Sequence, residues 1–155
     1  MLNRGQSVTL HGDGGHTRRY LYAGDTIDAF DTILHRGKVG EIYNIGSTDE
    51  ISNSELCRML LHQFGYGSAK NFDELVVHTA DRPFNDRRYA VNDSKLRNLG
   101  WRQKTPLADG LKITVDWYRQ FGEEWWGDIS HVLVPHTATK GPKGLGYGQL
   151  QGGRQ

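Results

Sequence analysis

The sequence predicts an α/β fold that is incomplete as a doubly wound sheet. Strand-like and helix-like segments alternate along the first 134 residues, but only three or four strand-like segments are present and each is short. The chain of 155 residues is long enough for about one domain, and its 36% apolar and 24% charged residues are typical of soluble globular proteins. We therefore expect one lobe, or a fragment of one.

The N-terminal elements are a predicted strand, a glycine turn and a helix. Residues 8–11 have strand composition and run into Gly12-Asp13-Gly14-Gly15, a turn cluster that cannot continue a strand. A hairpin or a sharp bend is expected there. Asp25 is the predicted N-cap of a helix that ends before Gly37. The apolar residues of this helix recur at helical spacing: Ile27, Phe30, Ile33 and Leu34.

The central elements are a predicted strand and a capped helix. Residues 41–45 alternate and are rich in β-forming residues, which predicts a strand that ends in the loop at residues 44–47. Ser52 and Glu55 have the S-x-x-E spacing of a capping box, in which each residue satisfies a backbone N–H of the other. A second amphipathic helix is therefore predicted to begin there and to close at Gly65.

The C-terminal elements are two short strands and two helical segments. Residues 75–78 and 89–91 are predicted strands on either side of an irregular polar loop. Asp93 is predicted to cap a short turn, and Thr105-Pro106 starts the last helix with a cap and a proline at its first position. One face of the last helix is apolar: Leu107, Leu111, Val115 and Tyr118.

Charge and composition exclude several classes of protein. The formal net charge of +1 creates no global field that would gather nucleic acid or an acidic membrane, so neither is an expected partner. No apolar run approaches the roughly 18 residues of a membrane-spanning helix, and the start lacks the apolar core of a secretion signal. Cys57 is the one cysteine and can close no disulfide within the chain, so a buried packing role and a cytoplasmic location are expected.

A change in composition predicts a domain boundary near residue 134. Residues 135–155 hold three basic residues, no acidic residue and many glycines, with too little apolar surface to offset chain entropy. We expect residues 1–134 to form the folded lobe and residues 135–155 to form a flexible, glycine-rich basic tail.

Motifs for cofactor, metal or nucleophile chemistry are missing from the sequence. Gly12-x-Gly14 opens no predicted helix and is followed by Thr17 where a dinucleotide fingerprint has its third glycine. The histidines lack the spacing of metal ligands, and no Gly-x-Ser-x-Gly motif is present. The pair Tyr66-x-x-x-Lys70 has the spacing of a dehydrogenase catalytic pair, but glycines on both sides of Tyr66 place it beyond a helix end, and the pair is set aside.

Two arginine clusters are the most promising binding motifs. Arg18-Arg19 follows the glycine turn, and Arg82 with Arg87-Arg88 lies in the loop that begins at Asp81. Guanidinium groups bind phosphate oxygens through paired, charge-assisted hydrogen bonds, so two clusters that the fold brings together could clamp a diphosphate. The alternative is that these arginines form ion pairs with neighbouring acids such as Asp81 and Asp86.

Asn53 and three aromatic residues are weaker candidates. The Asn53 carboxamide lies in the first turn of the capped helix, where free backbone N–H groups favour an anionic ligand. Its alternative role is that of a polar residue at a helix start. Tyr20, Tyr22 and Phe84 could offer a stacking surface for a base, although core packing is the commoner fate of aromatic residues.

These motifs, taken in order, carry a resemblance to a known family. The matching segments are Gly12-Asp13-Gly14, Arg18-Arg19-Tyr20-Leu21-Tyr22, Gly40-Glu41-x-Tyr43-Asn44-Ile45-Gly46, Asp81-Arg82-Pro83-Phe84-Asn85-Asp86-Arg87-Arg88-Tyr89 and Leu99-Gly100-Trp101. From about Gly5 to Trp126 the chain resembles the C-terminal half of nucleotide-sugar 4,6-dehydratases, the dTDP-glucose and UDP-glucose enzymes of the extended short-chain dehydrogenase/reductase family.

The resemblance implies the substrate-binding part of a Rossmann-type fold without its N-terminal Rossmann half, and residues that hold a nucleoside-diphosphate sugar. By matching, residues 9–14 would line the nucleotide end, Arg18 would hold the diphosphate, Asn53 would sit beside the nucleotide, and the loop would close over it. The implied substrate-binding residues are Thr9, Leu10, His11, Gly12, Asp13, Gly14, Arg18, Asn53, Asp81, Arg82, Pro83, Phe84, Asn85 and Arg87.

The resemblance also implies what this chain does not supply. In the family, NAD oxidises and then reduces the sugar while water is eliminated, and the glycine fingerprint and catalytic residues for this lyase reaction belong to the N-terminal half. We therefore expect no catalytic residue and no NAD binding in the chain alone, and inactivity by itself. The expected partners are a nucleoside-diphosphate sugar and the missing N-terminal half. An alternative is a non-catalytic truncated homologue that pairs with a full-length dehydratase or epimerase and modulates it.

Overall fold

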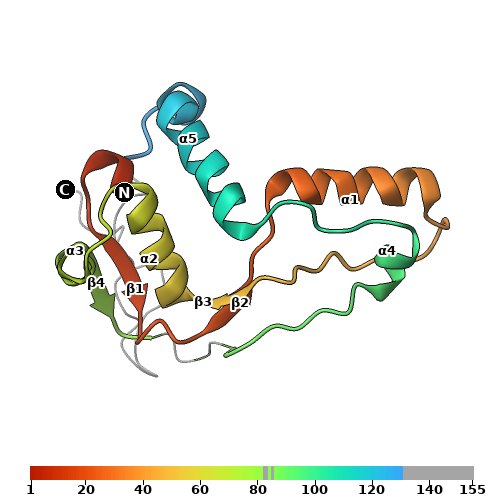
Figure 1. Ribbon diagram of the computed structural model, residues 1–155, viewed down its shortest axis with the longest axis horizontal. Coiled ribbons are helices and arrows are strands. Elements are labelled where there is room, and N and C mark those ends of the chain that lie inside the picture. Colours follow the sequence, from red (N-terminus) through yellow and green to blue (C-terminus); the bar gives the residue numbers. More distant parts are fainter. Residues whose placement is uncertain (82–83, 85, 131–155) are drawn as a thin grey trace, which may run out of the picture.

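The computed structural model describes residues 1–81, 84 and 86–130, and its helices and strands form an elongated arrangement (Figure 1). In chain order the elements are η1 (Leu2–Arg4), β1 (Val8–His11), β2 (Thr17–Arg19), α1 (Ala23–Arg36), β3 (Glu50–Ser52), α2 (Asn53–Gln63), α3 (Ala69–Leu75), β4 (Val76–Thr79), α4 (Ser94–Asn98) and α5 (Leu107–Trp126). The predicted α/β class is confirmed.

One end of the molecule is a parallel strand pair covered by α2. β1 and β4 pair in register from Val8 opposite Val76 to His11 opposite Thr79, and Figure 1 shows α2 beside them. A small apolar core lies between these elements and consists of Leu10, Cys57, Leu61 and Val76. Burial raises the pKa of the Cys57 thiol, so this residue is a protonated packing residue, as the sequence predicts.

The other end is α1 with α4 and the segments around them. Ala29, Leu96 and Trp101 form a second buried cluster there. The buried Asp25 carboxylate joins this end to the start of α5, because it accepts hydrogen bonds from the backbone N–H groups of Lys104 (3.3 Å) and Thr105 (3.0 Å).

The short antiparallel pair of β2 and β3 lies between the two ends (Figure 1). Thr17 stands opposite Ser52, and Arg19 stands opposite Glu50. α2 follows β3 directly and begins with the predicted capping box: the Glu55 N–H donates to the Ser52 Oγ (3.1 Å), and the Ser52 N–H donates to a Glu55 carboxylate oxygen (2.8 Å). The sequence did not predict β3, because a strand of three residues carries too little alternation to be recognised.

Several element predictions hold with shifted ends. β1 and the turn after it are confirmed, α2 ends two residues before Gly65, and β4 begins one residue later than predicted. The last helix begins at Leu107 with Pro106 as its N-cap, one residue later than the predicted cap at Thr105 and first-position proline at 106. Asp25 is not the N-cap of α1, because the helix already begins at Ala23 and Tyr22 is its cap. The Asp25 carboxylate instead accepts from the more distant backbone described above.

Two strand predictions are wrong for the described structure. Residues 41–45 and 89–91 have no regular secondary structure. A strand requires backbone hydrogen bonds to a neighbour, whereas the contact between these stretches of chain runs through a side chain, from the Asn44 amide to the carbonyl of Asn92 (3.3 Å). The predicted tail at residues 135–155 lies outside the described residues. Within residues 1–81, 84 and 86–130, no helix has the length and apolarity needed to cross a membrane.

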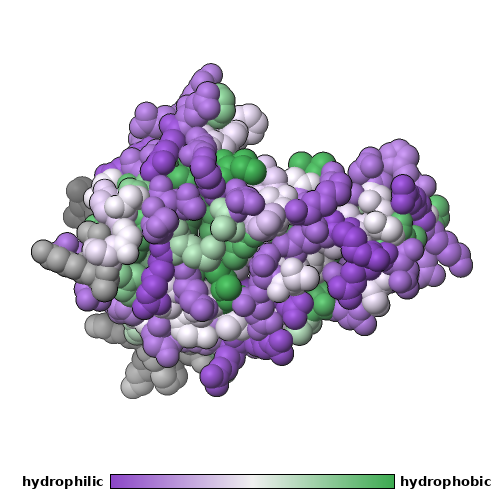
Figure 2. All heavy atoms as spheres, viewed as in Figure 1, coloured by the Kyte–Doolittle hydropathy of each residue, from purple (hydrophilic) through white to green (hydrophobic). Residues whose placement is uncertain are grey.

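The most apolar side of α1 faces outward. Ile27, Phe30 and Leu34 are 67%, 62% and 81% exposed, whereas Ala29 on the other side is fully buried. Figure 2 shows hydrophobic residues at the surface above the first turns of α1 and beside α5. An amphipathic helix normally turns its apolar stripe inward, so the orientation of α1 needs an explanation beyond the described chain.

Candidate functional site

The glycine turn after β1 is built into the fold. Gly12 and Gly14 have φ of +59° and +71°, a region that favours glycine. The Gly12 N–H donates to the Thr79 carbonyl (2.8 Å), which continues the pairing of β1 with β4 into the turn. A Cβ on Gly14 would lie 2.6 Å from the Leu10 Cδ2, so the turn packs against its own strand. The turn therefore leads into β2 and opens no helix.

Three histidines surround the turn. A ring N–H of His78 donates to the Gly12 carbonyl (2.8 Å between Nδ1 and O), and the His16 Nε2 lies 3.5 Å from an Asp81 carboxylate oxygen. Among the described residues, the Nδ1 atoms of His11 and His16 are buried without a hydrogen-bond partner. Buried polar atoms are usually paired, so the turn offers groups that a polar ligand could satisfy.

Asn53 lies next to the turn at the first position of α2. Its N–H donates to the His16 carbonyl (3.0 Å), and the N–H of Ser54 donates to the Gly14 carbonyl (3.0 Å). Because the Glu55 N–H donates to the Ser52 Oγ, the first three N–H groups of α2 are paired within the chain, and the expectation of free N–H groups at this helix start was wrong. The Tyr20 hydroxyl donates to the Asn53 Oδ1 (3.0 Å) and fixes the carboxamide. Burial raises the pKa of Tyr20, which keeps this hydroxyl protonated as a donor.

The fold brings the two arginine-bearing segments together. The Thr17 N–H on β2 donates to the Arg87 carbonyl (2.9 Å), so residues 86–89 run beside β2. The Arg18 guanidinium lies over the Tyr89 ring, 4.7 Å from its centroid, and also donates to the Thr17 carbonyl (2.7 Å). The convergence that a diphosphate clamp requires is present in the backbone.

Two of the arginines form ion pairs, as the alternative reading of the clusters expected. Arg88 donates from Nε (2.6 Å) and Nη2 (2.9 Å) to the two carboxylate oxygens of Glu50, and the Arg19 Nε lies 3.4 Å from the same carboxylate. The Arg88 hydrogen bonds are the main cause that lowers the pKa of Glu50 to about 2. The acid is thus Glu50, whereas the sequence suggested Asp81 or Asp86, because β3 was not foreseen.

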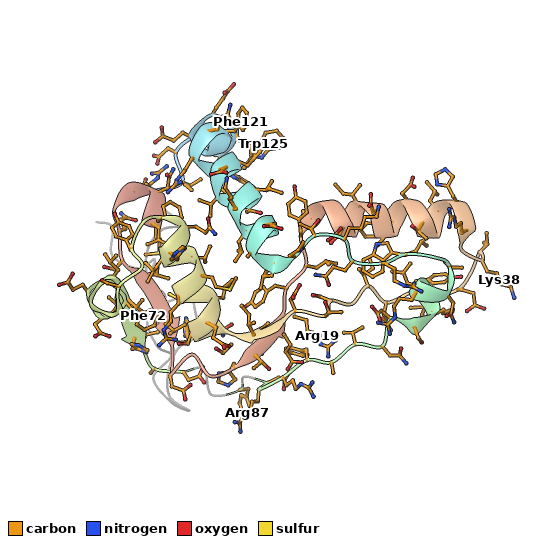
Figure 3. All side chains as sticks on the ribbon, viewed as in Figure 1. Arg19, Lys38, Phe72, Arg87, Phe121 and Trp125 are labelled. Carbon is orange, nitrogen blue, oxygen red and sulfur yellow. The ribbon has the colours of Figure 1, made fainter. Side chains whose placement is uncertain are left out.

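The remaining predicted site residues divide into three groups. Thr9, Leu10 and His11 lie on β1 beside the turn that holds Asp13, and Asp81 lies two residues after β4. Phe84 is 95% exposed, and Arg87 points outward from the molecule, away from Arg19 (Figure 3). Arg82, Pro83 and Asn85 lie outside the described residues. The roles of all these residues in binding remain predictions.

Sequence reasoning missed two residues of this arrangement. Glu50 joins β2, β3 and residue 88, and Tyr89 lies beneath the Arg18 guanidinium. Glu50 gave no local signal, because its partners are more than thirty residues away along the chain. Tyr89 did have a sequence signal. It follows Arg88 in a predicted strand, and neighbouring side chains of a strand point to opposite faces.

Comparison with known proteins identifies the class. The family model "GDP-mannose 4,6 dehydratase" matches residues 1–114, and the chain belongs to this family. It is 42% identical over 132 residues to a trifunctional UDP-glucose 4,6-dehydratase/UDP-4-keto-6-deoxy-D-glucose 3,5-epimerase/UDP-4-keto-L-rhamnose-reductase of Arabidopsis thaliana, covering 85% of this chain and 19% of that protein.

Two further relatives place the fold among Rossmann-type short-chain dehydrogenases. The chain is 40% identical to the dTDP-D-glucose 4,6-dehydratase of Homo sapiens, covering 87% of this chain and 39% of that protein. The dTDP-glucose 4,6-dehydratase structure from Streptomyces venezuelae with NAD bound superposes with a TM-score of 0.72 at 36% identity, covering 81% of this chain and 38% of that one. The chain thus spans two fifths or less of the length of these relatives.

The described residues do not fit NAD. A dinucleotide needs a glycine-rich turn between a strand and the N-terminus of a helix, where backbone N–H groups hold the pyrophosphate. The glycine turn described above leads into β2, and the space at Gly12 and Gly14 is filled by Asp81, Leu10 and Ser54. Tyr66 and Lys70 share no helix, because α2 ends at Gln63 and α3 begins at Ala69.

Proposed function

We propose that the chain is the C-terminal, substrate-binding part of a nucleoside-diphosphate-glucose 4,6-dehydratase and that it binds the sugar nucleotide without NAD. The observation that carries the proposal is the convergence of three segments on one place: the turn at residues 12–14, Arg18 with the segment at residues 86–89, and Asn53 at the start of α2. A guanidinium binds phosphate oxygens, and a fixed carboxamide is a group that can hydrogen-bond a base.

The relatives support the class of ligand. Their names describe dehydratases that act on dTDP-glucose or UDP-glucose. A more distant relative, the UDP-glucose 4-epimerase of Thermotoga maritima solved with UDP-glucose, is 29% identical and superposes with a TM-score of 0.68. NAD supplies the oxidation and reduction in such enzymes, and the described residues offer no glycine-rich turn into a helix that would hold it. We therefore expect no dehydratase activity from the chain by itself.

Calorimetric titration of the chain with UDP, dTDP and NAD tests the proposal. We expect saturable heats with UDP or dTDP and none with NAD. The described residues include groups that can bind a diphosphate, but no glycine-rich turn that could hold a dinucleotide. Binding of NAD with a nucleotide-like affinity, or no binding of either diphosphate, would overturn the assignment to the substrate-binding part.

We further propose that the outward face of α1 is covered by the N-terminal part of the family fold. The face consists of Ile27, Phe30 and Leu34, and two apolar residues that follow α1 in sequence, Val39 and Ile42, are 99% and 80% exposed. Contiguous exposed apolar surface marks an interaction site. Residues 41–45, which the sequence predicts as a strand, belong to no strand among the described residues, so their backbone is available to pair with another strand.

The hydrophobic dye ANS tests this face. We expect the isolated chain to bind ANS, and the double variant Phe30→Ser/Leu34→Ser to give clearly weaker fluorescence because the continuous apolar surface is interrupted. Val91→Ser serves as the matched control, since Val91 is 41% exposed and lies outside the face. A monomeric chain that melts cooperatively and gives no ANS signal would contradict the proposal.

A further inference from the structure

We propose that Glu50 is a positioning residue that holds residues 86–89 against β2 and so places Arg18 for the diphosphate. The inference rests on the proposed nucleotide-binding function and extends it to a residue that does not itself touch the ligand.

The Glu50 carboxylate joins three segments of the chain. It accepts two hydrogen bonds from Arg88 (2.6 and 2.9 Å) and one from the Thr17 hydroxyl (3.0 Å), and it lies 3.4 Å from the Arg19 Nε. A bidentate guanidinium–carboxylate pair fixes orientation as well as distance. The Glu50 side chain is only 19% exposed, which limits competition from water.

The contacts between β2 and residues 86–89 lie on two faces. Thr17, Arg19 and Arg88 contact Glu50 on one face, whereas their neighbours in sequence, Arg18 and Tyr89, contact each other on the opposite face. This is the alternation expected of extended chain. Glu50 therefore holds residues 86–89 on one face, and the Tyr89 ring on the opposite face supports the Arg18 guanidinium.

An isosteric comparison separates positioning from general stability. Glu50→Gln keeps the shape of the side chain but removes its charge, and Arg88→Met removes the other partner at similar length. We expect each variant to weaken UDP binding roughly three- to thirtyfold, which lies within the range of measured pairwise couplings. Uridine, which lacks the diphosphate, should bind all the variants within about twofold of its affinity for the unmodified chain. The double variant Glu50→Gln/Arg88→Met should have a UDP affinity no lower than that of the single variant that binds UDP less tightly.

Glu41→Gln is the matched control. It breaks the exposed Lys95–Glu41 pair (2.5 Å), which lies away from β2, and should leave UDP binding unchanged. If Glu50→Gln does not fold, Arg88→Lys keeps the positive charge without the bidentate geometry and provides the same comparison.

The outcomes are distinct. Equal UDP affinity in the variants and the unmodified chain, or a parallel fall in UDP and uridine affinity, would overturn the positioning role. If the unmodified chain binds no diphosphate, the proposed function fails, and the Tyr89 ring signals in NMR spectra then test the positioning claim alone. Those signals should shift in Glu50→Gln and stay in place in Glu41→Gln. Unshifted signals in Glu50→Gln would overturn the claim.

Discussion

Truncation of Leu96 to alanine is expected to lower the free energy of unfolding by about 2–5 kcal/mol, the range for removing a large buried aliphatic side chain. Leu96 is fully buried and packs with Ala29 and Trp101 between α4 and α1. The cluster contains few buried residues, so a cavity there removes much of what holds α4 to α1. Chemical denaturation followed by circular dichroism measures the change.

Leu34→Ala is the matched control for this prediction. Leu34 lies on α1 but is 81% exposed in the isolated chain, so its truncation should change the free energy of unfolding by less than about 0.5 kcal/mol. Equal effects of the two substitutions would mean that α4 does not pack on α1 as described.

Substitution of Arg18 by alanine is expected to weaken binding of UDP or dTDP by roughly 10- to 150-fold, because a charge-assisted hydrogen bond to phosphate contributes about 1.5–3 kcal/mol. Arg18 lies on β2 after the glycine turn, with its guanidinium over the Tyr89 ring. Calorimetric titration of both proteins gives the ratio of affinities.

Arg119→Ala provides the comparison for Arg18. The Arg119 guanidinium also lies over an aromatic ring, that of Phe64 at 4.6 Å, and donates to the Gln63 carbonyl (3.1 Å), but it belongs to α5. Loss of this arginine should leave nucleotide affinity unchanged. If Arg18→Ala binds UDP as tightly as the unmodified chain, Arg18 is no phosphate ligand.

The parts of the fold that the sequence predicted are those with local signals. The capping box of Ser52 and Glu55 shows the start of α2, and the glycines at residues 12 and 14 show the turn, because each needs only residues a few positions apart. The strand prediction at residues 41–45 failed for the opposite reason. Alternation shows that a segment can join a sheet, but the described chain offers it no neighbour.

In the candidate site, too, the features with local sequence signals were predicted and those that depend on distant partners were not. Arg18 and Asn53 were recognised from their places after a turn and at a helix start, and the fold puts both beside the turn. The partner of Arg88 could not be predicted, because Glu50 reaches it through the pairing of β2 with β3. The orientation of α1 was also unpredictable, since the spacing of its apolar residues does not say which side faces solvent.

The most direct test of the account is to map UDP on the chain by NMR. Addition of UDP to the isotope-labelled protein should shift the backbone amide signals of residues 9–18, Asn53 and residues 86–89, and should leave those of α4 and α5 in place. Shifts confined to α4 or α5, or no shifts at saturating nucleotide, would contradict a nucleoside-diphosphate site at the glycine turn.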